Sequence, residues 1–521
     1  MTDTEVLIVG AGPTGLMLGI QLVRAGVRAV IVDRHAGPAM QSRALGVQAR
    51  TLEIYARMGV IDSALALGTP ATGGNLWADG RLLGKVPLGQ AGARISPYPY
   101  ILVLGQDDNE HIMGERLNGL GLAVQWNTEL AALTQHGDHV QATIRNPDGS
   151  ERMLTAAWVA GCDGSKSAVR ELNGIGFPGA PYEHVFFVAD VTMTGNMVPG
   201  EVNIYLWKKG FHLFFPMRGQ DHWRLVGILP PELRDRSDVS FESVIPSVRV
   251  EAGETLAFKD CSWFSTYRIH HRRAAKFREG RCFLLGDAAH VHSPVGAQGM
   301  NTGLQDAYNL GWKLARVVQG RAAPALLDSY EAERFPVAER LLNTTDRGFR
   351  VIVADNPIAG LMRTQVLARF AALAMRSERV QALAFRTISQ TAIEYRDGPL
   401  SREEHGVSRD GPRAGDRFPW LKLQLTADGP VEDLFERFDD THWTLLLFRQ
   451  DAPAMDALPA EAMEVIAVSQ VPANETVLAD AKIEQPAYYL LRPDGHVGLC
   501  GGVLDADAMR RYFAEQMHAA P

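Results

Sequence analysis

Short apolar runs alternate with an apolar helical stretch through the first 33 residues. Residues 6–9 form a continuous apolar run, which is typical of a parallel strand covered on both faces. A glycine-rich turn follows, residues 16–25 continue as an apolar helix that Gly26 ends, and a second apolar run, residues 29–32, stops at Asp33. Because strand, helix and strand alternate here, the pattern predicts a doubly wound α/β sheet.

Two later apolar runs, residues 157–160 and 282–285, are each followed directly by a turn that contains glycine and aspartate. We expect both runs to join the same sheet. Between them, residues 176–275 hold aromatic, strand-like stretches divided by glycine and proline, which predicts an inserted antiparallel β-sheet domain. A helical pattern then runs from residue 301 to residue 319. The sheet domain therefore divides a first domain into two parts, residues 1–175 and 276–395.

A loop-like stretch, residues 397–415, separates a further unit from the first domain. Three apolar runs follow, and the chain closes with a predicted helix over residues 506–517. This pattern indicates a small α/β domain over residues 396–521. Its one cysteine, Cys500, has no partner thiol, which argues against dithiol redox chemistry there.

Composition and charge exclude several classes of protein. The 521 residues are 46% hydrophobic and 21% charged, as expected of a globular chain with several cores. Their net charge of −8 provides no basic field for nucleic acid. The four cysteines lie far apart, which indicates a reducing compartment, the cytoplasm. Residues 6–23 carry no charge, but their glycines and acidic flank argue against a membrane span or signal.

The first turn carries a dinucleotide-binding pattern. Gly10, Gly12 and Gly15 follow a strand and open a helix, and Asp33 ends the next strand. Such glycines let the backbone approach a pyrophosphate at the helix N-terminus, and the carboxylate accepts hydrogen bonds from a ribose. The pattern by itself does not separate FAD from NAD.

Two further turns favour a flavin. Asp287 stands at the end of an apolar run, and a glycine-rich loop, residues 294–299, leads from it to a helix. An acid at a strand end, followed by a helix N-terminus, suits the ribityl chain and pyrimidine edge of a flavin. Asp163 lies in a turn of the same kind. Each turn alone could be a capped aspartate–glycine turn, but their joint occurrence with the first motif favours FAD.

Three strings carry a resemblance to a known family: GCDGSKSAVR at residues 161–170, GDAAHVHSPVGAQGMN at 286–301 and LLDSYEAER at 326–334. They closely resemble the single-component FAD-dependent aromatic hydroxylases, in particular the phenol, hydroxyphenylpropionate and polyketide hydroxylase branch. The resemblance implies a Rossmann-like FAD-binding domain, an inserted β-sheet substrate domain and a thioredoxin-like C-terminal domain. It also implies that FAD is bound by Gly10, Gly12, Gly15, Asp33, Arg43, Gln106, Asp163, Asp287, Gly299, Met300 and Asn301.

The activity implied by the resemblance is hydroxylation of a phenolic or polyketide-like aromatic ring with NADPH or NADH and O2, through a flavin 4a-hydroperoxide. Only one G-x-G-x-x-G, residues 10–15, follows a predicted strand and opens a predicted helix, so we expect the nicotinamide to bind transiently rather than in a second Rossmann domain. A base that ionises a phenol would raise the nucleophilicity of its ring, and His212 and Tyr205 in the inserted sheet are our candidates. In residues 211–215, alternation places Phe211, Leu213 and Phe215 on one face.

Alternatives remain open at this point. A flavin dehydrogenase or halogenase would use the same scaffold, and a non-catalytic module that binds flavin and an aromatic ligand would share its motifs. His290 and His292 have the spacing of a metal pair, but no matching ligand pattern is visible, so we expect no metal. We expect a small aromatic partner, no nucleic acid and no membrane, and the chain could form a homodimer.

Overall fold

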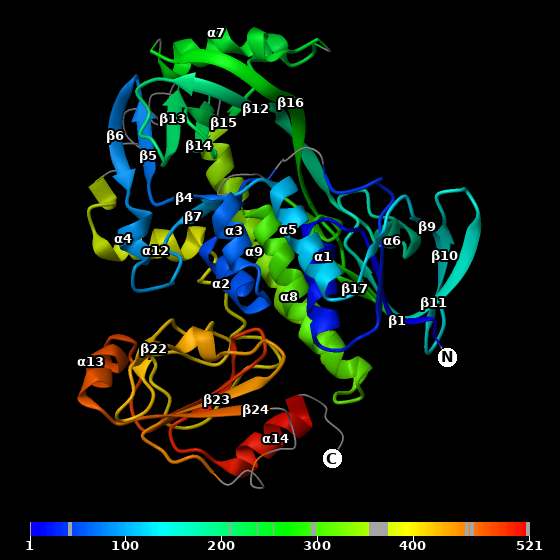
Figure 1. Ribbon diagram of the computed structural model, residues 1–521, viewed down its shortest axis with the longest axis vertical. Coiled ribbons are helices and arrows are strands. Elements are labelled where there is room, and N and C mark those ends of the chain that lie inside the picture. Colours follow the sequence, from blue (N-terminus) through cyan, green and yellow to red (C-terminus); the bar gives the residue numbers. More distant parts are fainter. Residues whose placement is uncertain are drawn as a thin grey trace.

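The computed structural model describes residues 2–39, 44–207, 210–236, 238–253, 255–292, 298–353, 373–453, 458 and 463–516. In Figure 1 a central α/β unit lies between a β-sheet unit at the top and a C-terminal unit at the bottom. None of the helices within these ranges combines the length and apolar character that a membrane span requires. The same ranges hold no cluster of three or more His, Cys, Asp or Glu side chains arranged for a metal ion.

The central unit is built on the doubly wound sheet that the sequence predicts. Its strand order is β17-β18-β11-β1-β2-β8, and β10 and β9 extend it from β11. Strands β1, β2, β8, β11 and β18 run parallel where they pair. Their bounds are β1 (Thr4–Val9), β2 (Ala29–Val32), β8 (Val124–Gln125), β9 (Glu129–Gln135), β10 (Val140–Arg145), β11 (Glu151–Gly161), β17 (Arg278–Glu279) and β18 (Cys282–Leu284).

Helices pack on this sheet and connect its parallel strands. Helix α1 (Pro13–Arg24) begins at a proline, whose fixed φ suits the first helical position, and Gly26 ends it at a φ of +78°. Small residues let α1 pack closely against its neighbours: a Cβ on Gly19 would lie 3.2 Å from Leu117, and one on Gly311 would lie 2.9 Å from Gln21. The further elements of this unit are α2 (Ala49–Met58), α3 (Ile61–Leu67), α4 (Leu88–Gly92), α5 (Gln106–Gly119), α6 (Ala168–Leu172), η2 (Gly286–Ala288), α8 (Gly299–Val318), η3 (Pro324–Leu327), α9 (Asp328–Val353), α12 (Glu378–Ile388) and the small sheet β3 (Gly46–Val47), β7 (Ile101–Val103) and β4 (Thr69–Ala71).

The upper sheet is larger and more mixed than the sequence predicts. Its order is β19-β16-β12-β15-β14-β13-β5-β6, and β13 pairs with β5 in parallel. Residues 74–86 and 290–291, outside the expected span of 176–275, thus complete the sheet. Helix α7 (Phe241–Ala252) lies on its outer face, away from the central unit (Figure 1). The other elements are β5 (Gly74–Ala78), β6 (Arg81–Val86), β12 (Gly179–Thr194), β13 (Val202–Trp207), β14 (Gly210–Pro216), β15 (His222–Ile228), η1 (Pro231–Leu233), β16 (Ala257–Arg273) and β19 (His290–Val291).

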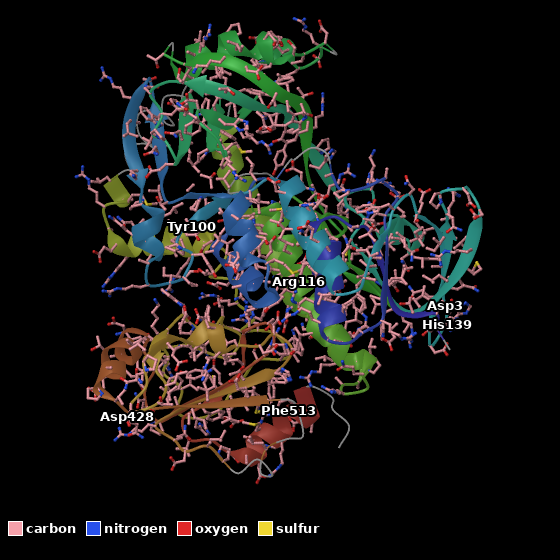
Figure 2. The ribbon with its side chains drawn as sticks, viewed as in Figure 1. Asp3, Tyr100, Arg116, His139, Asp428 and Phe513 are labelled. Atoms are coloured by element: carbon pink, nitrogen blue, oxygen red, sulfur yellow. The ribbon has the colours of Figure 1, made fainter. Side chains whose placement is uncertain are left out.

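The C-terminal unit forms a five-stranded sheet of order β20-β26-β25-β23-β24. One face packs within its own core, and the other packs against Trp312 of α8 and Leu326. Phe513, labelled in Figure 2, projects from α14 into this second core and contacts Trp443, with ring centroids 5.0 Å apart. The elements are β20 (Arg402–Glu403), β21 (Lys422–Gln424), β22 (Val431–Asp433), η5 (Leu434–Arg437), β23 (Trp443–Phe448), β24 (Met463–Val468), α13 (Pro472–Asp480), β25 (Ala487–Leu491), β26 (Val497–Gly501) and α14 (Ala506–Gln516).

Candidate cofactor site

The glycine and aspartate turns of the sequence meet at one edge of the central sheet. In the strand register, Val9 at the end of β1 pairs with Val32 of β2 and with Gly161 of β11, and Gly161 pairs with Leu284 of β18. Because these strands are parallel, the turns that follow them emerge side by side at the carboxyl edge, where open α/β sheets bind ligands. The turns that carry Asp33, Asp163 and Asp287 therefore share one corner of the molecule, as the motifs predict.

The first turn is shaped by its glycines. Gly10 has a φ of +101°, and a Cβ on it would overlap the carbonyl of Cys162. A Cβ on Gly15 would overlap the carbonyl of Gly10, whereas one on Gly12 would meet nothing within 4 Å. Gly10 and Gly15 thus permit close packing of the loop on the sheet and on α1, and Gly12 leaves open space in front of the helix N-terminus.

Asp33 braces this turn from the neighbouring strand end. Its Oδ2 accepts a hydrogen bond from the backbone N–H of Ala11 at 2.7 Å, and its Oδ1 accepts one from the N–H of His35 at 2.8 Å. The carboxylate therefore lies where the motif requires it, beside the glycine turn, and it also holds that turn in place.

Asp163 follows β11 at the centre of the corner. Its Oδ2 accepts from the N–H of Val169 at the start of α6, 3.1 Å away, and its buried Oδ1 has no hydrogen-bond partner within the described residues. Burial raises the pKa of this carboxyl above its ordinary value. A buried oxygen without a protein partner calls for a ligand or solvent donor.

Asp287 lies exposed at the end of β18, in a turn that other side chains support. The N–H of the preceding Gly286 donates to Asp306 Oδ2 at 3.0 Å, and the same oxygen lies 2.7 Å from His290 Nε2. Arg334 Nε donates to Asp306 Oδ1 at 2.7 Å. Burial alone would raise the pKa of Asp306, but Arg334 and His290 outweigh it and hold the pKa below its usual range.

Sequence reasoning did not identify Asp306. In the sequence, Asp306 stands five residues after Asn301 on the polar side of the predicted helix, with Thr302, Asn309 and Lys313 at helical spacing from it. His290 acts as its buried partner, which agrees with a structural rather than a metal-binding role for that histidine.

Helix α8 brings its first turn to the corner. A Cβ on Gly303 would lie 2.6 Å from Thr14 Oγ1 and 3.0 Å from Gly286, so the start of α8 packs directly on the first and third turns. Asn301 is buried, and its amide joins α8 to the segment before α2: its Oδ1 accepts from Gln48 N–H at 2.9 Å and its Nδ2 donates to Gly46 O at 2.7 Å. Asn301 thus orients the helix start, with Gly299 and Met300 on its first turn.

Two predicted contacts lie farther along the chain. Gln106 is the first residue of α5, and its Nε2 donates to Glu110 Oε1 at 2.8 Å. Glu110 Oε2 accepts from Ala39 N–H at 2.7 Å, and burial raises the pKa of Glu110. Arg43 lies outside the described residues, as do residues 293–297 of the glycine-rich loop.

These residues fit the group that the motifs imply. FAD needs room for its pyrophosphate at the N-terminus of α1, and Gly12 leaves that room. It also needs polar partners along its ribityl chain, and Asp163 Oδ1 and the exposed Asp287 lie at neighbouring strand ends. The described residues could thus hold the cofactor from the end of β2 to the start of α8.

The structure does not support His212 or Tyr205 as the base. Both side chains are buried on the α7 face of the upper sheet: His212 Nε2 lies 2.5 Å from Glu251 of α7, and Tyr205 stacks on Trp77 at 5.3 Å. Tyr205 belongs to the core formed with Val244 and Val248 of α7. Alternation along β14 is correct, but it does not say which face turns toward the cofactor.

The opposite face of that sheet turns toward the central unit. Phe215 and Met217 pack with Leu45 and Val103 of that unit, and Leu213 lies on the same side. Arg224 is also on this face, paired with Asp190 through Nε–Oδ1 and Nη2–Oδ2 contacts of 2.5 and 2.6 Å beneath the ring of Trp263. The described side chains of this face thus include the apolar Leu213, Phe215 and Met217 and, beside them, the Arg224–Asp190 ion pair.

Comparison with known proteins gives consistent matches. A family model described as "FAD binding domain" matches residues 3–345. The chain is 34% identical to 6-methylpretetramide 4-monooxygenase of Streptomyces rimosus, over 95% of this chain and 90% of that protein. The structure resembles OxyS anhydrotetracycline hydroxylase from Streptomyces rimosus (TM-score 0.80, 28% identity, covering 99% and 100% of the two chains). It also resembles aklavinone-11 hydroxylase in complex with FAD and aklavinone (TM-score 0.79, 25% identity, covering 99% of each chain).

These relatives are named as hydroxylases and monooxygenases. Their names do not favour the alternatives of a halogenase, a dehydrogenase or a non-catalytic flavin module. Sequence motifs, strand register and relatives agree that this chain belongs to the FAD-dependent aromatic monooxygenases, which hydroxylate an aromatic ring with NAD(P)H as the reductant.

Proposed function

We propose that the chain hydroxylates a phenolic ring within a fused, polyketide-like aromatic system, using O2. The observation that carries this proposal is the register of β1, β11 and β18, which brings the glycine and aspartate turns together in the central unit. Leu45 and Val103 of the same unit pack on the apolar face of the upper sheet. The relatives named for 6-methylpretetramide, anhydrotetracycline and aklavinone support a substrate of this kind.

Bound FAD would accept hydride from the nicotinamide and activate dioxygen. The chain would hold it with Gly10, Gly12, Gly15 and Asp33 at the pyrophosphate and ribose. Asp163, Asp287 and the first turn of α8, Gly299 to Asn301, would hold its ribityl chain and ring, and Gln106 and Arg43 would add contacts. The helix N-termini of α1 and α8 would stabilise negative charge on the bound group.

The upper sheet would orient the substrate ring. Leu213, Phe215 and Met217 offer an apolar surface toward the central unit, which would exclude water from the reacting atoms. The paired Arg224 and Asp190 keep charge on this face neutralised, which suits a largely apolar ring system.

For the chain as a whole we propose residues 1–175 and 276–395 as the FAD-binding domain, 176–275 with strands β5 and β6 as the substrate domain, and 396–521 as a thioredoxin-like domain. The order β24-β23-β25-β26 supports the last assignment, because β23 and β24 are parallel, the other pairs are antiparallel, and α13 and α14 follow β24 and β26. Burial raises the pKa of Cys500 to about 12, which leaves its thiol unreactive.

Transient nicotinamide binding, a cytoplasmic location and a homodimer stay predictions. The four cysteines form no disulfide, which agrees with a reducing compartment. Sedimentation velocity on the purified protein tests the homodimer.

The proposed function is tested by supplying purified, FAD-loaded protein with NAD(P)H and a panel of phenols and fused aromatic compounds. We expect faster nicotinamide oxidation with a subset of them and a product heavier by one oxygen atom. Nicotinamide oxidation that yields only peroxide with every compound would contradict the proposed substrate class. Asp287→Ala should weaken FAD retention, and an unchanged FAD affinity would remove that contact.

A further inference from the structure

A row of charged side chains lies buried between α8, α9 and the C-terminal unit. Arg492, just after β25, donates to both oxygens of Glu333 on α9, at 2.6 and 2.9 Å. Lys313 of α8 donates to Glu333 Oε2 at 2.7 Å, and the three side chains have no exposed surface. The C-terminal unit thus reaches both helices through one carboxylate.

The row continues along the same two helices to the cofactor corner. Arg334 follows Glu333 on α9, and it donates to Asp306 Oδ1 at 2.7 Å and to the carbonyl of Thr302 at 3.1 Å. Asp306 in turn holds the N–H of Gly286, the residue before Asp287. Residues 302, 306, 309 and 313 are spaced by four, three and four, so they form one face of α8.

The C-terminal unit contacts this row at further points. Asp494 accepts from Trp312 Nε1 of α8 at 3.1 Å and pairs with Arg492. The ring of Tyr395, whose hydroxyl accepts from Arg334 at 3.0 Å, lies 4.4 Å from the ring of His496. Contacts therefore run without a break from Asp494 and His496 to Gly286.

The energetics indicate a role other than stability. Moving charged side chains out of water costs free energy, and only well-formed ion pairs offset that cost. Apolar side chains of similar size would stabilise the interface at least as well. Trp312 and Trp443, with ring centroids 5.7 Å apart, already give this interface an apolar core. The directional hydrogen bonds of the charged row fix the position of α8 relative to α9 and to the turn of Gly286 and Asp287.

We propose that Arg492, Glu333 and Arg334 are positioning residues for the cofactor. Through them the C-terminal unit fixes α8, and thereby the helix start and the turn of Gly286 and Asp287, whose Gly286 N–H is bonded to Asp306. Both would lie beside the bound flavin. The inference rests on the proposed placement of FAD at the corner, which Asp287→Ala tests separately.

The test uses three variants of the full chain: Arg492→Lys keeps a buried positive charge but loses the two-pronged contact, Arg492→Met removes the charge, and Tyr395→Phe removes one acceptor of Arg334. FAD affinity is measured on the folded apoproteins by flavin fluorescence, together with the visible spectrum of the bound flavin. We expect the FAD dissociation constant to rise about tenfold in Arg492→Lys, more in Arg492→Met and less in Tyr395→Phe, where tenfold corresponds to about 1.4 kcal/mol.

Leu446→Ala is the matched control. Leu446 is fully buried in the core of the C-terminal unit but is not part of the charged row, so this variant lowers the melting temperature without altering the row. We expect its FAD affinity and flavin spectrum to stay at the wild-type values. If Arg492→Met does not fold, Arg492→Lys and Tyr395→Phe carry the test.

Equal losses of FAD affinity in Leu446→Ala and Arg492→Lys would overturn the proposal, because loss of stability alone would then explain both. If Asp287→Ala weakens FAD binding while Arg492→Lys and Tyr395→Phe do not, the positioning role is overturned and the cofactor site stands. If Asp287→Ala, Arg492→Lys and Tyr395→Phe all leave FAD affinity unchanged, both the cofactor site and the positioning role are overturned.

Discussion

Gly12 and Gly15 stand three residues apart in one motif, yet their surroundings differ. A Cβ on Gly15 would overlap the backbone of Gly10, whereas a Cβ on Gly12 would project into open space. Gly15 is therefore required by the fold itself, and Gly12 by the group that occupies the space before α1.

We predict that Gly12→Ala changes the free energy of unfolding of the apoprotein by no more than about 1 kcal/mol, since only the helix cap is altered. Its FAD dissociation constant should nevertheless rise by at least about tenfold, because the new methyl group lies where the pyrophosphate binds. Gly15→Ala should destabilise the apoprotein by about 3 kcal/mol. Denaturant unfolding and FAD titration measure both effects, and equal stability losses in the two variants would contradict this assignment.

The pKa of Glu333 makes a second prediction. Burial would raise it, but Arg492 and Lys313 outweigh burial and lower the pKa to about 2 from 4.5. A carboxyl with a lowered folded-state pKa contributes stability above pH 4.5, and this contribution is lost as the pH falls toward 2. We expect the free energy of unfolding to fall by an amount on the order of 3 kcal/mol over this range because of Glu333 alone. The slope should be shallower in Glu333→Gln, and an equally steep slope would show that other groups titrate.

At the residue scale, the sequence predicts the residues whose conformation or position in a motif is distinctive. Gly10, Asp33 and Asp163 stand at strand ends, as their motifs require. Asp306 and Glu110 escape such reasoning, because an acidic residue on a helix usually belongs to a solvated face. Only the packing of α8 against α9 shows that Asp306 is buried between Arg334 and His290.

Among the elements, β14 shows what alternation of residues in a strand can predict and what it cannot. Alternation separates Phe215 from His212 correctly, but only tertiary packing decides which of them faces α7. The parallel pairing of β13 with β5 joins residues 202–206 to residues 74–78. Local sequence patterns do not predict a pairing between segments so far apart in the chain. In contrast, α8 agrees with its predicted span, because its apolar spacing and Gly320 are local signals.

The two faces of the upper sheet give a third prediction. Phe215→Ala should raise the KM for the aromatic substrate about tenfold while the FAD dissociation constant changes little, since the ring packs on the substrate side. Tyr205→Phe is the matched control on the other face, where the Tyr205 hydroxyl donates to Asn196 Oδ1 at 3.4 Å, its one hydrogen bond among the described residues. We expect its KM and kcat to stay within about twofold of wild type, since little transition-state interaction is lost. A large fall in kcat for Tyr205→Phe would restore this residue as a candidate base.

For the whole molecule, the arrangement in Figure 1 places the central unit between the upper sheet and the C-terminal unit. The C-terminal unit packs on Trp312 of α8, and the upper sheet packs on Leu45 and Val103. The proposed division of the chain rests on its composition and linker, because glycine, proline and apolar runs are local features of the sequence. The charged row between α8, α9 and Arg492 does not, since its members lie up to 186 residues apart in the sequence, from Asp306 to Arg492.

The central claim is that the strand ends at Gly10, Asp163 and Asp287 hold one FAD. A crystal structure of the chain grown with FAD tests it most directly. We expect density for the pyrophosphate in front of Gly12, for the ribityl chain beside Asp163 and Asp287, and for the flavin ring between the first turn of α8 and the Phe215 face of the upper sheet. FAD bound elsewhere, with these three turns in contact only with solvent, would contradict the account.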